Sequence, residues 1–409
     1  MTRNGALRKL LNTSDLPLAW LQLKRQPIRY LVAVIGIGFA SLLMYMQIGF
    51  QSGLLTSATT FYENLDADLF IISPATLNSG SYQQYPESLL ARSAGVPGVQ
   101  STTAVYIVNI STQKLNDIKA TSLRLIGFEP EAKIFKRADI NAQLEKIKIP
   151  GYVLFDELGN KNTGPIAKAI KEQGFQDLIL SNFSDQFRAV GLFKLGSTFA
   201  ADSNLIASDA TTLQLASRQI NLGEISLGLI KLQNPSQISL VQTELKQLYG
   251  DEVQVLNRKQ LISQERDYWN KSTSLGIIFG FGTFMGFLVG GVVVYQVLYT
   301  DVSDHLKEYA TLKAMGFSDQ FVLWVVIQEA FLLAASSFIP ATLVSAGLYA
   351  FLSSATSIRI AMTGDKTLLV SSLTFGVCAA SAAVSYTHLR ASAAIAIQKL
   401  RDADPASVF

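Results

Sequence analysis

Four long apolar stretches dominate the pattern of hydrophobic and polar positions along the chain. Residues 30–62, 272–300 and 367–387 contain no charged side chain, and residues 321–358 contain a single one, Glu329. A helix needs about 20 mostly apolar residues to cross a bilayer. Each stretch is long enough, so the pattern predicts four transmembrane helices, which we place at 30–56, 269–300, 320–352 and 367–389.

The segment between the first two stretches, residues 57–268, has a different pattern. Its apolar and polar residues alternate in short runs separated by turn residues, which is typical of half-buried strands. The predicted elements are strands at 99–110, 121–128, 151–155, 188–195 and 224–232, helices at 86–94 and 236–248, and a closing strand near 252–256. The predicted fold class is therefore a membrane protein with four transmembrane helices and a large α+β extracytoplasmic (periplasmic) domain inserted between helices 1 and 2.

The distribution of Lys and Arg predicts the topology. Residues 1–29 carry Arg3, Arg8, Lys9, Lys24, Arg25 and Arg29 against one acid, Asp15. Short segments rich in Lys and Arg stay in the cytoplasm, so we predict an amphipathic cytoplasmic N-terminal segment at 1–29 and a retained first helix. Four spans then place the loop 301–319 and the tail 390–409 inside the cell and the loop 353–366 outside. The expected location is the inner (plasma) membrane.

Composition excludes several classes of function. Charged residues are 16% of the chain, against about 25% in a soluble protein, and a net charge of +3 is too small to indicate a nucleic-acid partner. One cysteine, Cys378, cannot form an internal disulfide, and with His305 and His388 it cannot build a His/Cys metal site. Residues 57–268 contain no histidine, which excludes a Ser/His/Asp set there. We expect no catalytic residue, metal or cofactor.

One pair of neighbouring acids in the insert is the nearest candidate for carboxylate chemistry. Asp156 and Glu157 stand shortly before Gly159 and Asn160. Adjacent acids ahead of Gly and Asn favour a solvated turn over a catalytic pair.

Glycines in the predicted spans indicate close helix packing. Gly282, Gly286 and Gly290 are four residues apart and share one helix face, and Gly49 and Gly53 have the same spacing in the first span. Such faces let a neighbouring backbone approach. Packing against the first span of the same chain and a seam between two copies are both open.

Glu329 is the ionisable group farthest inside a predicted span. A carboxylate at a helix centre costs roughly 2.5–3.5 kcal/mol on insertion scales, so Glu329 should have a polar partner. Gln328 lies beside it. We favour a structural hydrogen bond between helices over a proton relay.

The loop 301–319 has an apolar stripe at helical spacing. Val302, Leu306, Tyr309 and Leu312 recur at three- and four-residue intervals, and Gly316 stands where a helix would end. An amphipathic helix here could lie on the membrane surface. Its mixed charge instead favours a groove on a partner protein.

The run HLKEYATLKAMG at 305–316 resembles the loop after the second span in the MacB/FtsX superfamily of ABC permeases, where such a pattern marks the coupling helix. Residues 17–23, 43–50, 67–69, 328–330 and 399–409 are similar to the cyanobacterial DevC branch. The resemblance implies that this loop contacts an ATPase. The implied coupling residues are Asp304, His305, Leu306, Lys307, Glu308, Leu312, Lys313, Ala314 and Gly316.

The resemblance implies a non-catalytic permease subunit of a tripartite exporter. Such permeases are homodimers in membrane lipid, with a separate ABC ATPase (DevA-like), a periplasmic membrane-fusion adaptor (DevB-like) and a TolC-like outer-membrane channel. The sequence contains no Gly-x-x-x-x-Gly-Lys-Ser/Thr loop, so ATP would be bound by the partner subunit. The cargo would be envelope lipid, glycolipid or another periplasmic compound. Two alternatives stay open: an FtsX-like transmembrane signalling subunit that activates a cell-wall hydrolase, and a lipoprotein-releasing permease.

Overall fold

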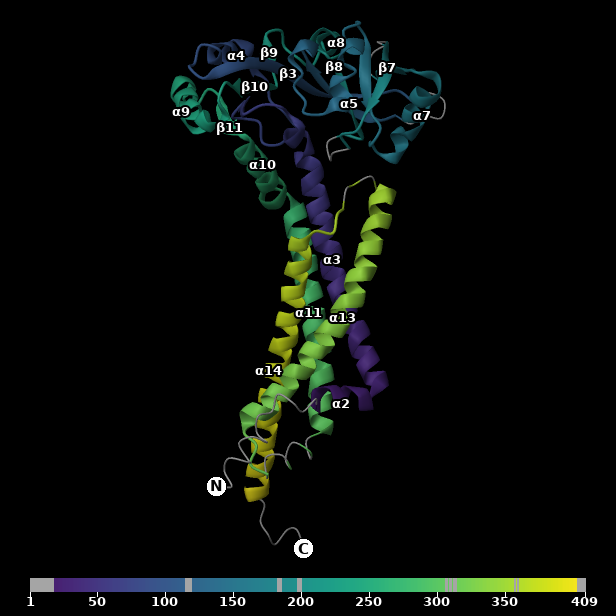
Figure 1. Ribbon diagram of the computed structural model, residues 1–409, viewed down its shortest axis with the longest axis vertical. Coiled ribbons are helices and arrows are strands. Elements are labelled where there is room, and N and C mark those ends of the chain that lie inside the picture. The colour runs from purple at the N-terminus through teal and green to yellow at the C-terminus, as the bar shows by residue number, and fades with distance from the viewer. Residues whose placement is uncertain are drawn as a thin grey trace, which may run out of the picture. The chain divides into compact units, whose positions relative to one another are not determined.

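The computed structural model describes residues 18–114, 120–181, 186–196, 201–305, 308, 311, 315–356, 358 and 360–402 (Figure 1). The chain divides into two compact units. One comprises Met1–Phe50, Ile278–Tyr349 and Ala361–Phe409, and the other comprises Gln51–Ile277 and Ala350–Ile360.

Four helices among the described residues are long and apolar enough to cross a membrane. They are α3 (Pro27–Asn64), α11 (Ser274–Asp304), α13 (Asp319–Thr356) and α14 (Gly364–Asp402). Three of them coincide with the uncharged stretches and α13 coincides with the stretch that contains Glu329, so a multi-pass membrane protein is supported. Their ends differ from the sequence-based bounds: α3 runs on past residue 56, α11 runs to residue 304 inside the predicted loop, and α13 and α14 run on past residues 352 and 389. A π-helical turn at Tyr268–Ser272 precedes α11.

A short helix, α2 (Leu18–Arg25), precedes α3 and ends in Lys24 and Arg25. Gln26 separates the two helices because the proline that follows it disfavours helical backbone at the preceding residue. Pro27 itself starts α3, where its missing N–H group costs no helical hydrogen bond. The core of the helix-bundle unit consists of small and branched side chains that are almost completely buried. They include Ala33, Ile37, Val294, Leu298, Val326, Ala330 and Cys378.

The second unit is built on one large mixed sheet. Its order in the described part of the chain is β11-β1-β10-β3-β4-β8-β5-β7-β6. The pairs β4·β8 and β5·β7 are parallel and the remaining pairs are antiparallel. In chain order the strands are β1 (Leu69–Ile72), β3 (Val99–Ser111), β4 (Ser122–Phe128), β5 (Tyr152–Asp156), β6 (Gln176–Ile179), β7 (Gln186–Phe193), β8 (Ser203–Ser208), β10 (Leu227–Leu232) and β11 (Gln254–Asn257).

Helices and a two-stranded ribbon accompany this sheet. The ribbon pairs β2 (Tyr85–Pro86) with β9 (Glu224–Ile225). The α-helices are α4 (Glu87–Ser93), α5 (Ala138–Asn141), α6 (Leu144–Ile147), α7 (Gly164–Gln173), α8 (Asp209–Leu215), α9 (Ile238–Tyr249) and α10 (Arg258–Asp267). Short 3₁₀ turns occur at Pro130–Ala132, Lys161–Thr163 and Pro235–Gln237.

Both faces of the sheet are buried. Alternate residues of β1 belong to two different hydrophobic clusters: Leu69 and Ile71 pack into one, and Phe70 and Ile72 into the other. The first cluster includes side chains of α4, α7, α8 and α9, and the second includes Phe61 and Tyr62 from the end of α3 and Leu261 from α10. The insert is therefore a folded mixed α/β domain with its own core.

The predicted strands and helices of the insert are confirmed as β3, β4, β5, β7, β10, α4 and α9. The run 224–232 is split into two strands at Ser226, whose hydroxyl accepts a hydrogen bond from Ile107 N–H at 3.0 Å. The predicted closing strand is β11, but β1 lies between β10 and β11 in the sheet.

Candidate functional site

The predicted coupling loop follows α11. Leu306, Lys307, Leu312, Lys313 and Ala314 lie outside the described residues, so their predicted role stays a prediction. Glu308 is exposed. Met315 N–H donates to the Thr311 carbonyl oxygen at 3.0 Å, and Gly316 has a φ of 96°. A glycine in this left-handed conformation, just after a helical hydrogen bond, ends a helical turn.

An ion pair stands at the end of α11. Arg29 Nη1 of α3 donates to Asp304 Oδ2 at 2.7 Å, and the two side chains are 34% and 48% exposed. Asp304 is the last residue of α11, directly before the loop. The first span is therefore joined to the second at the point where the loop begins.

A buried acidic cluster lies one turn deeper. Asp301, His305 and Glu329 are all less than 10% exposed. His305 Nδ1 lies 2.9 Å from the Asp301 carbonyl oxygen and 3.5 Å from Asp301 Oδ1. The carboxyl groups of Asp301 of α11 and Glu329 of α13 lie close enough for each to act on the charge of the other. An ionised carboxylate only accepts hydrogen bonds, so a direct hydrogen bond between them would need a proton on one of the two.

The polar partner of Glu329 thus comes from another helix. Gln328, which precedes Glu329, is half-buried and faces an apolar groove instead. Within the described residues, Asp301 Oδ2 and Glu329 Oε2 are buried without a hydrogen bond. Together with the Arg29–Asp304 ion pair, this cluster ties α3, α11 and α13 to one another beside the loop.

The glycine face of α11 packs against α3 of the same chain. A Cβ atom built on Gly286 would lie 3.1 Å from Met44 Cγ, and one on Gly290 would lie 3.0 Å from Ala40 Cβ. A Cβ on Gly282 would meet Gln47. In α3, Gly49 faces Tyr349 of α13, whose hydroxyl donates to the Tyr45 carbonyl oxygen. Gly53 is buried. These contacts favour packing within the chain over a glycine seam between two copies.

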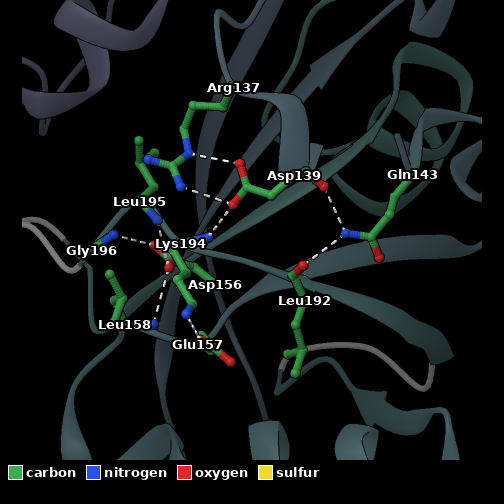
Figure 2. Close-up of polar contacts among 10 residues, drawn as sticks. All are labelled: Arg137, Asp139, Gln143, Asp156, Glu157, Leu158, Leu192, Lys194, Leu195 and Gly196. Carbon is green, nitrogen blue, oxygen red and sulfur yellow. Dashed lines mark hydrogen bonds and ion pairs between the residues drawn. The ribbon is translucent and has the colours of Figure 1, made fainter. Parts of the chain in front are cut away.

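In the α/β domain, Asp156 is completely buried, and its place in a solvated turn was a wrong expectation. Its carboxylate accepts hydrogen bonds from the backbone N–H groups of Leu158, Leu195 and Gly196 at 2.6–3.1 Å (Figure 2). A fourth comes from Asn204 Nδ2 at 2.8 Å. Burial raises the pKa of Asp156 above its usual value, while the four hydrogen bonds act in the opposite direction. Through these hydrogen bonds Asp156, at the end of β5, holds the chain segment that comes after β7 in place. Its role is therefore structural and not that of a catalytic acid.

Glu157, next to it, points to two lysines. Its carboxylate lies 2.9 Å from Lys171 Nζ and 3.0 Å from Lys194 Nζ. The hydrogen bond from Lys171 is the main cause that lowers the pKa of Glu157 below its usual value. Nearby, Arg137 makes a bidentate ion pair with Asp139 (Figure 2). The Oδ2 atom of Asp139 also accepts a hydrogen bond from Lys194 N–H. These ion pairs join elements of the α/β domain to one another. The carboxylates of Glu157 and Asp139 are both engaged in them, so they do not form a free acid–base pair.

The buried Arg124 of β4 was not among the residues predicted from the sequence. Its side chain is 1% exposed, and none of its three guanidinium nitrogens has a hydrogen bond. Its neighbours across the sheet are Asn109 and Asn204. Tyr62 and Glu265 lie close enough for its charge to lower their pKa values, although burial raises both overall. In the sequence, the only indication of a buried arginine was a single charge within the apolar run 123–128.

Glu265 is already bonded to other groups. It accepts from Ser79 N–H at 2.7 Å, from Ser79 Oγ at 2.8 Å and from Trp269 Nε1 at 2.7 Å. Ser79 also lines a small polar cavity of about 220 Å³ beside β3. Among the described residues, no group of three or more His, Cys, Asp or Glu side chains is placed to hold a metal ion.

The helix-bundle unit contains the segment that matches a known family. Residues 280–393 match the family model "FtsX-like permease C-terminal". This segment includes most of α11, the loop, all of α13 and much of α14. The match over this segment supports the FtsX-like permease part of the predicted resemblance. No curated protein matches the chain at a significant level.

Three solved structures are similar to about half of the chain. The periplasmic region of MacB from Actinobacillus actinomycetemcomitans is 15% identical, covers 49% of this chain and 92% of its own, and gives a TM-score of 0.32. The extracellular domain of the noncanonic ABC-type transporter YknZ from Gram-positive bacteria is 14% identical over 47% and 99%, with a TM-score of 0.30. A domain of a putative permease from Porphyromonas gingivalis is 14% identical over 46% and 86%, with a TM-score of 0.28.

Proposed function

We propose that this chain is the permease subunit of an ABC exporter and that it transmits the motion of a separate ATPase through its helix bundle. The observation that carries the proposal is the FtsX-like match over residues 280–393, which spans the loop between α11 and α13. Because the sequence has no phosphate-binding loop, ATP would be bound and hydrolysed by a partner chain.

The contacts beside the loop suit a part that transmits force. The Arg29–Asp304 ion pair joins α3 to α11, and the buried carboxyl groups of Asp301 and Glu329 lie close to each other between α11 and α13. A displacement of the loop by the ATPase would therefore move three spans together rather than bend one. Coupling through such packed elements needs two discrete arrangements of the helices. We propose that ATP binding selects one arrangement and hydrolysis returns the other.

The finer assignment rests on the DevC-like motifs at both ends of the chain. In it, a homodimer works with a DevA-like ATPase in the cytoplasm, a DevB-like adaptor in the periplasm and a TolC-like channel. The α/β domain lies in the periplasm and drives envelope lipid, glycolipid or other periplasmic cargo outward. The FtsX-like match also fits a signalling subunit that activates a cell-wall hydrolase, and a lipoprotein-releasing permease.

The test of the proposed function is affinity purification of the full chain from its native membranes in mild detergent. An ABC ATPase and an adaptor in the eluate would support the exporter. An ATPase with a cell-wall hydrolase and no adaptor would support the signalling alternative. An eluate without any ATPase would contradict the proposed function.

A substitution in the loop tests the coupling residues. Leu312 belongs to the apolar stripe of the loop sequence. In the proposed ATPase groove, replacing its side chain by that of glutamate would lose roughly 1.5–3 kcal/mol of apolar burial. We expect Leu312→Glu to reduce the ATPase retained per permease sharply. Glu308→Lys is the matched control, since it reverses a charge in the same loop without touching the stripe and should weaken retention less. Equal retention in wild type and Leu312→Glu would make this loop a membrane-surface helix.

A further inference from the structure

An apolar groove with a volume of about 680 Å³ lies in the helix-bundle unit along α13. Its floor is one face of α13, on which Trp324, Gln328 and Ala335 lie at four- and seven-residue spacing. The rest of the lining is Phe331 and Leu332 of α13, Ala19 and Trp20 of α2, and Phe375 of α14. None of these residues belongs to the loop or to the ion pair described above.

The groove has the length of one half of a bilayer. Trp324 and Ala335 are eleven residues apart, and a rise of 1.5 Å per residue separates them by roughly 16 Å. The hydrocarbon core of a membrane is about 30 Å thick, so one leaflet occupies about 15 Å. The face from Trp324 to Ala335 therefore fits an extended acyl chain of a single leaflet.

The two ends of the groove differ in chemistry. At one end stand Trp20 and Trp324, whose side chains are 49% and 52% exposed. Tryptophan is enriched at the membrane–water interface, which marks this end as the headgroup level. Gln328 lies one turn deeper, where its amide can donate to an ester carbonyl. Lys24 is exposed one turn after Trp20 on the same side of α2.

We propose that this groove is a binding site for one glycerophospholipid of the leaflet on the α2 side. The headgroup lies at the Trp324 end with its phosphate near Lys24, the ester carbonyl accepts a hydrogen bond from Gln328, and one acyl chain runs from there along α13 past Ala335. A lipid is the occupant because α13 is long and apolar enough to span a membrane and the groove-lining Trp324 and Phe331 are 52% and 44% exposed on it, where a bilayer would surround the helix. The inference does not depend on the proposed function.

The first measurement is tryptophan quenching in the full-length protein, stripped of lipid in detergent and titrated with a phospholipid brominated on its acyl chain. The chain has three tryptophans, and the double variant Trp20→Phe/Trp324→Phe keeps only Trp269. In the wild type we expect tryptophan quenching that saturates at one lipid per chain. In the double variant we expect this saturable quenching to be absent. Quenching that rises without saturation would mean ordinary annular contact and would overturn the proposal.

The second measurement is the lipid retained per chain in native mass spectrometry. Ala335→Phe fills the deep end of the groove, and Val344→Phe is the matched control, since Val344 is 55% exposed on the same helix and does not line the groove. We expect about tenfold weaker lipid binding for Ala335→Phe, the order of effect of mismatched volume in an apolar pocket, and no change for Val344→Phe. Two other results would contradict the proposal. One is equal lipid binding by both variants. The other is that the protein forms a dimer without bound lipid and Ala335→Phe dissociates it, which would mean that another copy of the chain occupies the groove.

A third variant tests the ester contact. Gln328→Leu removes the amide and keeps the groove apolar. It should weaken binding of an ester-linked phospholipid but not of its ether-linked analogue. Equal weakening of both lipids would mean that Gln328 does not contact the ester.

Discussion

Arg29 of α3 and Asp304 of α11 form an ion pair with an Nη1–Oδ2 distance of 2.7 Å at the residue where α11 gives way to the loop. The two residues are far apart in sequence, and each belongs to a different apolar helix. The pair is partly exposed, so its contribution comes from fixing the geometry of two helix ends rather than from a large free energy.

A double-mutant cycle measures this contribution. We expect Arg29→Ala and Asp304→Ala each to lower the unfolding free energy, with an interaction energy of roughly 0.2–1 kcal/mol, the usual range for exposed pairs. The measurement is thermal unfolding of the full chain in detergent at low and high salt. Arg25→Ala, an exposed cation at the end of α2, is the control for a general charge effect. An interaction energy of zero at low salt would contradict the pairing.

The second prediction concerns the contact between Asp301 and Glu329. A glutamine at position 329 can donate its amide N–H to the Asp301 carboxylate, so Glu329→Gln should unfold close to the wild type. Glu329→Lys puts a larger, charged side chain among buried side chains and should be strongly destabilising. Folded yield and thermal unfolding in detergent distinguish the two. Loss of the folded protein with Glu329→Gln would show that the bundle requires the carboxyl group itself.

Long uncharged runs in the sequence are sufficient to predict α3, α11, α13 and α14, because only an apolar helix of that length satisfies its backbone in lipid. Alternation is sufficient to predict β3 and β7, each of which has polar or part-exposed positions. It fails for β1 and β8, in which every residue is buried. A strand covered on both faces has no period of two and reads as a short continuous run.

The polar residues show a second limit of local sequence. The pair Asp156-Glu157 looks like a surface turn because neither Asn204 nor the segment after β7 is near in sequence. Only the parallel pairing of β5 with β7 and the antiparallel pairing with β8 bring those donors to Asp156. Likewise, the need of Glu329 for a partner follows from its position in a span, but the identity of Asp301 follows only from how α11 and α13 pack.

The third prediction follows from the lowered pKa of Glu157. A carboxylate whose pKa is lowered in the folded state stabilises it at pH values above the unfolded pKa, and the effect is lost as pH falls through the folded pKa. Glu157→Gln should therefore lower the unfolding free energy near neutral pH by roughly 0.2–1 kcal/mol and have no effect once the wild-type carboxyl is protonated. Thermal unfolding of both proteins is compared at pH 7 and at successively lower pH values. A loss that does not shrink as the pH falls would contradict the ionic origin.

The fourth prediction compares two arginines of the α/β domain. Arg124 has no hydrogen bond from its guanidinium, whereas Arg258 donates to the carbonyl oxygens of Leu65 and Ala67 at 2.8 and 2.6 Å. Burying a charge without hydrogen-bond partners costs free energy, and an apolar side chain of similar volume does not carry that cost. We expect Arg124→Met to unfold at or above the wild-type temperature and Arg258→Met to unfold below it, because the latter leaves carbonyl groups unpaired. A large loss with Arg124→Met would reveal a partner that this buried guanidinium holds.

The fifth prediction concerns the glycine face of α11. A Cβ at Gly286 would stand 3.1 Å from Met44 Cγ and 3.4 Å from Met44 N, so a larger side chain has to push α3 away. Gly280 lies on the same helix, is exposed, and has nothing within 4 Å of a Cβ. We expect Gly286→Leu to lower the unfolding free energy by about 1–3 kcal/mol, the usual effect of overpacking, and Gly280→Leu to leave it nearly unchanged. Thermal unfolding and the oligomeric state of the full chain in detergent are measured together. If Gly286→Leu instead dissociates a dimer and leaves the unfolding temperature of each chain unchanged, the face is a seam between copies and does not serve to hold α3.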